Sequence, residues 1–135
     1  MDHTISEIIL SSNFSDIDME FVVKEIQGTY WANNRSREMI LLSISHSLCY
    51  SAFIKGNQVG FMRVITDYAT FAYLCDVVVE KKSRGKGIGQ KMLKEVLANP
   101  ELKNVMWTLR TKDAHSLYEK FGFSRTVRPE RYMEM

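Results

Sequence analysis

The spacing of hydrophobic residues in the N-terminal part of the chain predicts a strand and then a helix. The strand is predicted over Thr4 to Leu10. Ser15 is the expected N-cap of the helix, with Asp18 three residues later as in a capping box, and Gly28 is expected to end it. Its apolar residues are Phe21, Val22 and Ile26.

A second helix is predicted after a loop that contains the aromatic residues Tyr30 and Trp31. Ser36 is its expected N-cap, because a serine side chain at that position can accept a hydrogen bond from the first turn. The apolar face of this helix is expected to consist of Met39, Ile40 and Ile44.

Three strands are predicted next, over Leu48 to Lys55, Gln58 to Ile65 and Phe71 to Val79. The first two are separated by Gly56-Asn57, and a two-residue loop with glycine first favours a type II′ hairpin and antiparallel pairing. Both alternating faces of the third strand are largely apolar, which is typical of a central strand covered on two sides. Asp76 is the exception in that strand.

The C-terminal part predicts a parallel β-α-β unit and a short final helix. A helix after the glycine-rich turn has apolar residues at helical spacing and ends at Asn99-Pro100, and a strand over Val105 to Leu109 follows. Phe71 to Leu109 is therefore expected to form a right-handed crossover. Asp113 is the expected cap of a helix through Phe121, with Gly122 as its left-handed C-cap.

The element order is thus β-α-α-β-β-β-α-β-α-β, with an extended C-terminal segment that can add one strand. It predicts an α/β protein with a central mixed sheet of six to seven strands and about four helices covering both faces. Residues 1–135 contain no repeat or linker, so we expect a single domain.

Composition narrows the possible functions. The chain is 45% hydrophobic and 25% charged, and its net charge of +2 is too small to indicate broad nucleic-acid binding. The N-terminus lacks signal-peptide features and no apolar run is long enough for a membrane span, so we expect a cytoplasmic protein without a membrane partner. Cys49 and Cys75 are expected to be buried thiols, and the histidines lack the spacing of metal ligands, so no metal is expected.

The turn from Lys81 to Gly89 has the features of a phosphate-binding site. Its glycines let backbone N–H groups gather at a helix N-terminus, and four of the six residues from Lys81 to Lys86 are basic. A dinucleotide fingerprint that starts at Gly85 fails because position 90 is Gln90, and a P-loop fails because Gly87 stands where Ser or Thr is needed.

Two motifs carry a resemblance to a known family. Arg84, Gly87 and Gly89 fit the pattern Arg/Gln-x-x-Gly-x-Gly/Ala, and Ala114 to Phe123 fits A-x-x-L-Y-E-K-x-G-F. In these motifs and in its element order the chain resembles the GNAT superfamily of acetyl-CoA-dependent N-acetyltransferases. The residues before Phe71 match this family in layout only.

The resemblance implies an acyltransferase that moves an acetyl group from acetyl-CoA to a primary amine by direct attack in a ternary complex. The acceptor can be a small-molecule amine or a protein or peptide amine, and the protein a monomer or homodimer. The pantetheine arm is expected between the strands Phe71 to Val79 and Val105 to Leu109. A bulge in the first of these would turn a backbone N–H of Cys75, Asp76 or Val77 toward the thioester.

The implied cofactor-binding residues are Val77, Val78, Val79, Arg84, Gly85, Lys86, Gly87, Ile88, Gly89, Thr111, Ala114 and Tyr118. Thr111 stands where many members have asparagine.

The resemblance gives Tyr118 contact with the leaving sulfur, and Asp76 is the candidate general base because it is the only charge in an apolar strand. The alternative for Asp76 is to bind backbone N–H groups or an arginine such as Arg63. Weaker candidate bases are Glu80, Asp67 and Glu130.

Four aromatic residues are expected to line the amine pocket: Tyr30, Trp31, Phe71 and Tyr73. The alternative for each of them is packing in the core. Rival functions are a non-catalytic acyl-CoA-binding or sensor domain and a nucleic-acid-binding domain.

Overall fold

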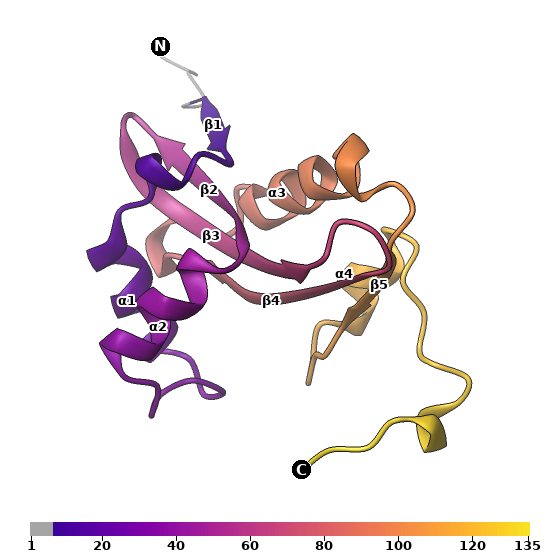
Figure 1. The fold of residues 1–135 in the computed structure, drawn as a ribbon. Helices are drawn as coiled ribbons and strands as arrows, with labels where there is room; N and C mark the ends of the chain where they lie inside the picture. Colours follow the sequence, from indigo (N-terminus) through magenta and orange to yellow (C-terminus); the bar gives the residue numbers. More distant parts are fainter. Residues whose placement is uncertain (1–6) are drawn as a thin grey trace.

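The computed structural model describes residues 7–135, so the start of the first predicted strand lies outside the described part. A five-stranded sheet runs in the order β1-β2-β3-β4-β5, antiparallel except for the parallel pair β4 and β5 (Figure 1). The strands are β1 (Ile8–Ser11), β2 (Leu48–Ile54), β3 (Asn57–Thr66), β4 (Phe71–Val79) and β5 (Met106–Leu109). The predicted mixed sheet and its parallel unit are confirmed.

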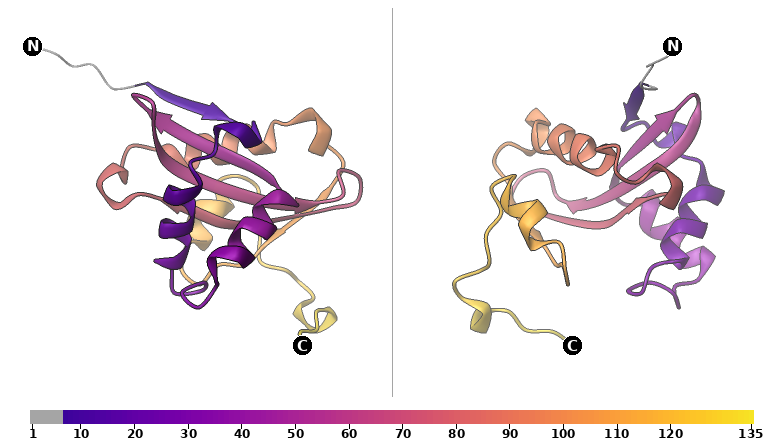
Figure 2. Two further views of the ribbon diagram at one scale, coloured as in Figure 1. Left: turned by 60° about the vertical axis from the view of Figure 1, so that its left-hand side comes forward. Right: turned by 180° about the vertical axis from the view of Figure 1, so that it is seen from behind.

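The prediction of six to seven strands is too high for residues 7–135. After Gly122 the chain runs outside the sheet and forms only a short 3-10 turn, Pro129–Arg131 (Figure 2). Every residue from Ser124 to Met135 is exposed, so this segment buries no side chain against the sheet.

Helices cover both faces of the sheet, as predicted. One face carries α1 (Met19–Gln27) and α2 (Arg37–Ser45), while α3 (Ile88–Leu97) packs on the other and α4 (His115–Glu119) follows β5 (Figures 1 and 2). The core under α1 and α2 is centred on Val22, Ile26, Ile40, Ile44 and Phe61. The core under α3 includes Ile88, Met92, Leu93 and Val96.

Side-chain caps fix where the first two helices begin. The predicted Ser36 cap is confirmed, because its hydroxyl accepts from the Met39 N–H at 3.1 Å. The predicted Ser15 cap is wrong: Asp18 accepts from the Phe21 N–H at 3.2 Å, and α1 starts at Met19. Ser15 instead lies in a short 3-10 turn before the helix, and Gly28 ends α1 as predicted.

The hairpin between β2 and β3 is antiparallel as predicted, but its loop is displaced by one residue. Ile54 pairs with Asn57, so the loop is Lys55-Gly56 rather than Gly56-Asn57. Both loop residues have positive φ, 51° at Lys55 and 81° at Gly56, which identifies a type I′ turn instead of type II′.

The predicted Asp113 cap is also wrong. Ala114 is the N-cap of α4, and the Thr111 hydroxyl accepts a hydrogen bond from its N–H at 3.0 Å. The left-handed conformation predicted for Gly122 is confirmed by a φ of 97°.

Gly60 lets α3 lie close to the sheet. A Cβ at this position would stand 3.0 Å from both Ile88 Cγ2 and Met92 Cε. Gly60→Ala is therefore expected to lower the free energy of unfolding by about 1 to 3 kcal/mol, measured by urea denaturation. The matched control is Gly28→Ala, whose Cβ would meet only backbone oxygens at 3.4 Å or more. Equal stability of the two variants would contradict this account of the helix–sheet contact.

Candidate active site

A β-bulge interrupts β4 in the middle of the sheet. Phe61 pairs with Val78 but Arg63 pairs with Cys75, so Asp76 and Val77 together oppose Met62. Asp76 has a φ of 51°. Leu74 and Val77 are three residues apart and would point to opposite faces of a regular strand, but both contact the core under α3. The bulge therefore lies within the three residues named from the sequence and directs Asp76 toward the α1 and α2 face.

The Asp76 carboxylate binds three donors from other parts of the chain. Its Oδ1 accepts from Trp31 Nε1 at 3.1 Å, while Oδ2 accepts from Arg35 Nη1 at 2.8 Å and Arg63 Nε at 2.9 Å. The side chains of Asp76, Arg63 and Arg35 are 1%, 10% and 22% exposed. Pairing with Arg63, the alternative left open by the sequence, is thus present, and this group is called the Asp76 cluster below.

Arg35 was missed by sequence reasoning. It precedes Asp76 by 41 residues and lies in the loop between α1 and α2, so nothing in its local pattern predicts the contact. The available signal was indirect, since the same loop carries Tyr30 and Trp31, which were expected to line the amine pocket.

β4 and β5 separate beside the bulge. Their pairing runs only from Phe71 with Met106 to Leu74 with Leu109, whereas β4 continues to Val79. The backbone of β4 after Leu74 is consequently not hydrogen-bonded to β5, which leaves the part of β4 that was expected to bind the pantetheine arm without a strand partner on that side.

Tyr118 is half-buried on α4 and packs against the core under α3. Its ring meets that of Phe123 edge-on, with centroids 5.9 Å apart. Burial raises the pKa of Tyr118 above its ordinary value, so the phenol keeps its proton at neutral pH and can act as a hydrogen-bond donor.

The glycine turn places backbone N–H groups at the start of α3. Gly85 and Gly87 have φ values of 84° and 78°, and Gly87 is the N-cap with no side chain to occupy the helix end. The first N–H groups of a helix have no intrahelical acceptor, so those at Ile88 and Gly89 point outward from the helix.

The surroundings of this turn are open and basic. A Cβ added at Gly85, Gly87 or Gly89 would meet no atom within 4 Å. Gly89 also has no positive φ, so neither backbone strain nor packing within the chain requires glycine there. Exposed basic side chains flank the turn at Lys81, Lys82, Arg84 and Lys86. This geometry suits the close approach of a polyanionic ligand.

The residues predicted to line an amine pocket are only partly brought together. Trp31 belongs to the Asp76 cluster, and Tyr30 packs edge-on against Trp31 with a centroid distance of 5.1 Å. Tyr73 lies on the same face of β4, and its hydroxyl accepts from Arg110 Nε at 3.2 Å. Phe71, by contrast, starts β4 and is about 16 Å along the strand from Asp76.

Two other expected cofactor positions are occupied by contacts within the chain. The Thr111 hydroxyl binds the Ala114 N–H, and the Val79 carbonyl accepts from Arg84 Nε at 3.1 Å. Both contacts hold the ends of the elements that flank the gap between β4 and β5.

The cysteines are free thiols, with Cys49 buried and Cys75 half-buried. Burial raises the pKa of Cys49 to about 12 and that of Cys75 to about 11. Neither is therefore a thiolate at neutral pH, and the structure offers no activated cysteine nucleophile in residues 7–135.

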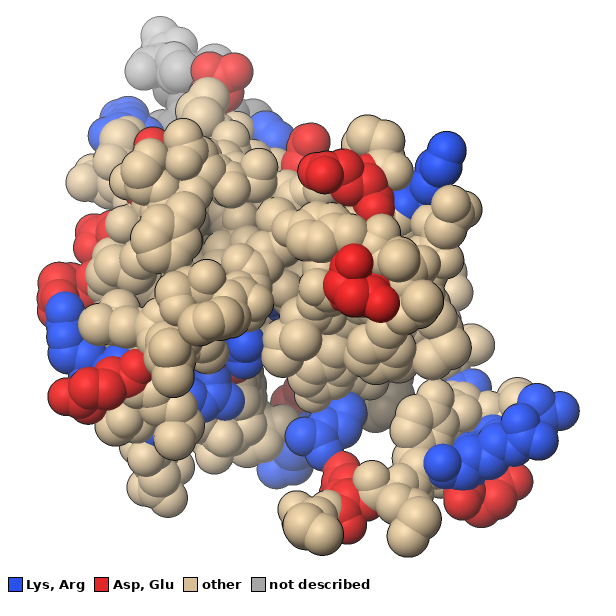
Figure 3. All heavy atoms as spheres, viewed as in Figure 1, with Lys and Arg blue, Asp and Glu red and all other residues tan. Residues whose placement is uncertain are grey.

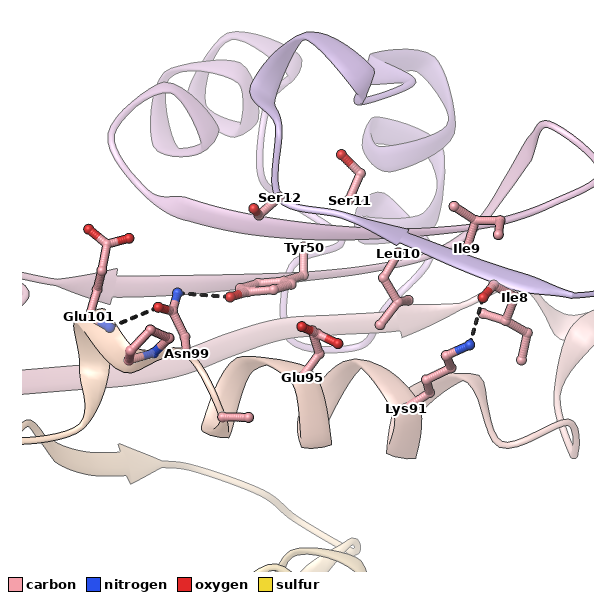
Figure 4. Close-up of a pocket in the computed structure, with 12 residues that line it drawn as sticks. Ile8, Ile9, Leu10, Ser11, Ser12, Tyr50, Lys91, Glu95, Asn99 and Glu101 are labelled. Atoms are coloured by element: carbon pink, nitrogen blue, oxygen red, sulfur yellow. Dashed lines mark hydrogen bonds between the residues drawn. The ribbon is translucent and has the colours of Figure 1, made fainter.

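A surface groove lies at the opposite edge of the sheet, between β1 and α3. Its polar contacts are internal: Lys91 Nζ donates to the Ile8 carbonyl at 2.7 Å, and Asn99 Nδ2 donates to the Tyr50 hydroxyl at 2.9 Å (Figure 4). None of the residues predicted for catalysis or cofactor binding lines this groove.

Charges of both signs are interspersed on the face shown in Figure 3, without a single-sign region that would favour nucleic acid. None of the helices in residues 7–135 is long and apolar enough to cross a membrane. The same residues contain no group of three or more histidine, cysteine, aspartate or glutamate side chains placed to hold a metal ion.

Comparison with known proteins agrees with the motifs. Residues 45–125 match the family model of the acetyltransferase (GNAT) domain. A candidate acetyltransferase from Gibberella zeae is 30% identical, over 67% of this chain and 63% of its own length. The present chain therefore spans less than two thirds of that relative.

Solved structures share the whole fold. A candidate GNAT-family acetyltransferase from Xanthomonas campestris pv. campestris has a TM-score of 0.94 and 36% identity, over 98% of this chain and 94% of that chain. N-acetylglutamate synthase from Neisseria gonorrhoeae, in complex with coenzyme A and N-acetyl-glutamate, has a TM-score of 0.72 and 15% identity, over 94% of this chain and 30% of that chain. At 15% identity, the similarity to N-acetylglutamate synthase is evidence for a shared fold alone.

Proposed function

Because the chain belongs to the GNAT family of acetyltransferases, we propose that it transfers an acetyl group from acetyl-CoA to a primary amine by direct attack in a ternary complex. The observation that carries this proposal is the glycine turn at the start of α3. Its N–H groups and exposed cations lie at the end of β4, whose backbone has no strand partner beyond Leu74 on the β5 side. When bound, acetyl-CoA supplies the activated acyl group.

The residues around this turn fit a pyrophosphate. The N–H groups at the start of α3 would bind its oxygens, and the basic side chains of Arg84 and Lys86 would balance its charge. Backbone groups of Val77 to Val79 would hold the pantetheine arm, and Ala114 and Tyr118 on the far side of the gap would complete the site. The open space at Gly89 supports this assignment, because a ligand can approach the backbone closely there.

The bulge is assigned the stabilisation of negative charge on the acyl oxygen. A bulge removes a backbone N–H from the regular ladder, and a donor already aimed at a developing charge lowers the barrier without reorganisation. The N–H groups of Asp76 and Val77 are the candidates. Tyr118 is assigned to the departing sulfur, to which its protonated hydroxyl would donate a hydrogen bond.

Asp76 has two possible roles, base and partner of arginine, and its contacts favour the second. Both carboxylate oxygens already accept hydrogen bonds and the side chain is only 1% exposed, so an amine could reach Asp76 directly only if the residues around it moved. We therefore assign Asp76 to positioning Arg35 and the loop that carries Trp31, and the amine proton to a water relay. The pH dependence of turnover separates the two roles.

Binding of acetyl-CoA tests the proposal and separates it from the nucleic-acid alternative. At 100 times its dissociation constant, acetyl-CoA is expected to add about 2.7 kcal/mol of stability and raise the Tm by roughly 10 °C.

Gly89→Val is expected to bind acetyl-CoA at least about tenfold more weakly than wild type. The free energy of unfolding of the unliganded variant should stay within about 0.5 kcal/mol of wild type, because a Cβ at this position meets no atom within 4 Å.

Gly89→Ala is the matched control, and it should retain binding because the family pattern accepts alanine there. Stabilisation by an oligonucleotide but not by acetyl-CoA would overturn the proposal. Binding without CoA release from any amine would favour the sensor alternative.

A further inference from the structure

The Asp76 cluster contains more positive than negative charge. Two guanidinium groups bind the same carboxylate oxygen, while the third partner, Trp31, is neutral. One carboxylate can compensate only one of the two arginines. Since a charge largely removed from water is stabilised by a partner, the surplus cation favours an anion from outside this cluster.

The unused hydrogen-bonding capacity belongs to Arg35. Arg63 is nearly buried and also donates from Nη1 to the Ser47 hydroxyl at 3.1 Å. Arg35 makes one side-chain hydrogen bond among residues 7–135, through Nη1, and is the more exposed of the pair. Its remaining N–H groups form the planar fork that binds a carboxylate in bidentate fashion.

Arg35 is also held in place by its backbone. Its N–H donates to the Ala32 carbonyl at 3.0 Å, and its own carbonyl accepts from Gln27 Nε2 at 3.0 Å. Anchoring at the backbone and at Asp76 limits the entropy that Arg35 would lose on binding a ligand, which favours affinity.

The positive charge of Arg35 lies next to the bulge of β4. Arg35 binds the side chain of Asp76, and Asp76 is part of the bulge whose N–H groups we assign to the acyl oxygen. Two more cations occur on this side of the molecule, with Arg110 beside Tyr73 and Lys112 above the ring of Tyr30 at 5.2 Å. The carboxylate of Glu134 already pairs with Arg110.

We propose that the acceptor is a small amine that also carries a carboxylate, and that Arg35 binds this carboxylate and thereby determines acceptor specificity. The inference rests on the proposed function and narrows its substrate class. It disfavours polyamines, which would bring further positive charge to a site with a surplus of it, and it disfavours an isolated protein lysine, which brings no anion.

CoA release should be measured with pairs of amines that differ only in the carboxylate: glycine with methylamine, β-alanine with ethylamine, and 4-aminobutyrate with propylamine, with spermidine as the polycation. The carboxylated member of at least one pair is expected to exceed its partner and spermidine about tenfold or more in kcat/KM. Arg35→Gln is expected to lower that value roughly 10- to 100-fold through KM, with acetyl-CoA stabilisation unchanged.

Arg37→Gln is the matched control, because Arg37 is an exposed arginine two positions away that pairs with Glu20. It should leave kcat/KM unchanged. Arg35→Lys, which keeps the charge but loses the planar fork, should restore part of the activity lost in Arg35→Gln.

Three results would overturn the inference. The first is that amines without a carboxylate are used as well as their carboxylated partners. The second is that Arg35→Gln reduces kcat/KM equally for both members of a pair, which would indicate a structural role. The third is that no amine releases CoA from a protein that binds acetyl-CoA, which would overturn the proposed function with it.

Discussion

Asp76→Asn is expected to lower the free energy of unfolding by about 3 to 5 kcal/mol, the largest effect of any single substitution considered on stability. The substitution removes the negative charge that Arg35 and Arg63 share, so that both cations lose their ionic partner in a buried setting. Asparagine has nearly the same volume and tolerates the positive φ at this bulge, which confines the change to the charge.

Urea denaturation measures this loss, and Asp113→Asn provides a control, because Asp113 is exposed and does not cap α4. If Asp76→Asn alone is too unstable, Arg35→Gln combined with Asp76→Asn should recover part of the stability by removing an unpaired cation. A loss below about 1 kcal/mol would show that the cluster contributes little.

The pH dependence of the same variant separates the two roles of Asp76. If Asp76 positions Arg35, Asp76→Asn should reduce kcat/KM by a similar factor across the pH range and leave the shape of the profile unchanged. Loss of the limb that reports the base would restore Asp76 to the catalytic role predicted from the sequence.

Features that depend on local chemistry could be predicted from the sequence. The left-handed conformation predicted for Gly122 follows from its place at a helix end, where a positive φ is needed. The Ser36 cap and the parallel pairing of β4 with β5 also follow from short-range rules. The glycine-rich basic turn from Lys81 to Gly89 is of this kind, since its glycines and basic residues adjoin in sequence.

Features set by distant contacts were predicted less well. The hairpin loop was placed one residue too late, because strand pairing rather than the presence of glycine decides which residues form the turn. The strand count was too high for residues 7–135, because an extended segment after Gly122 was expected to add to the sheet, and the sequence does not show whether such a segment finds a partner strand. The partners of Asp76 come from β3 and from the loop between α1 and α2, and Arg35 carries no local signal of its role.

Tyr118→Phe is expected to lower kcat about 100-fold, an increase of about 2.7 kcal/mol in the activation barrier, while acetyl-CoA stabilises the variant as it does wild type. The reason is that the phenol hydroxyl is assigned to the leaving sulfur, whereas the ring supplies the packing against Phe123 and the core under α3. Phenylalanine keeps the ring and removes only the donor. Because burial raises the pKa of Tyr118, the hydroxyl remains protonated throughout the neutral range, so the loss should be independent of pH there.

Single-turnover measurements of CoA formation test this expectation, because they report the rate of acetyl transfer without a contribution from product dissociation. Tyr132→Phe is the matched control, because Tyr132 is an exposed tyrosine in the C-terminal segment outside the sheet, and it should leave kcat unchanged. If Tyr118→Phe turned over at the wild-type rate, the hydroxyl would have no part in the departure of the thiolate. Stabilisation of the charge that develops during transfer would then rest on the bulge N–H groups and on another donor near the gap between β4 and β5.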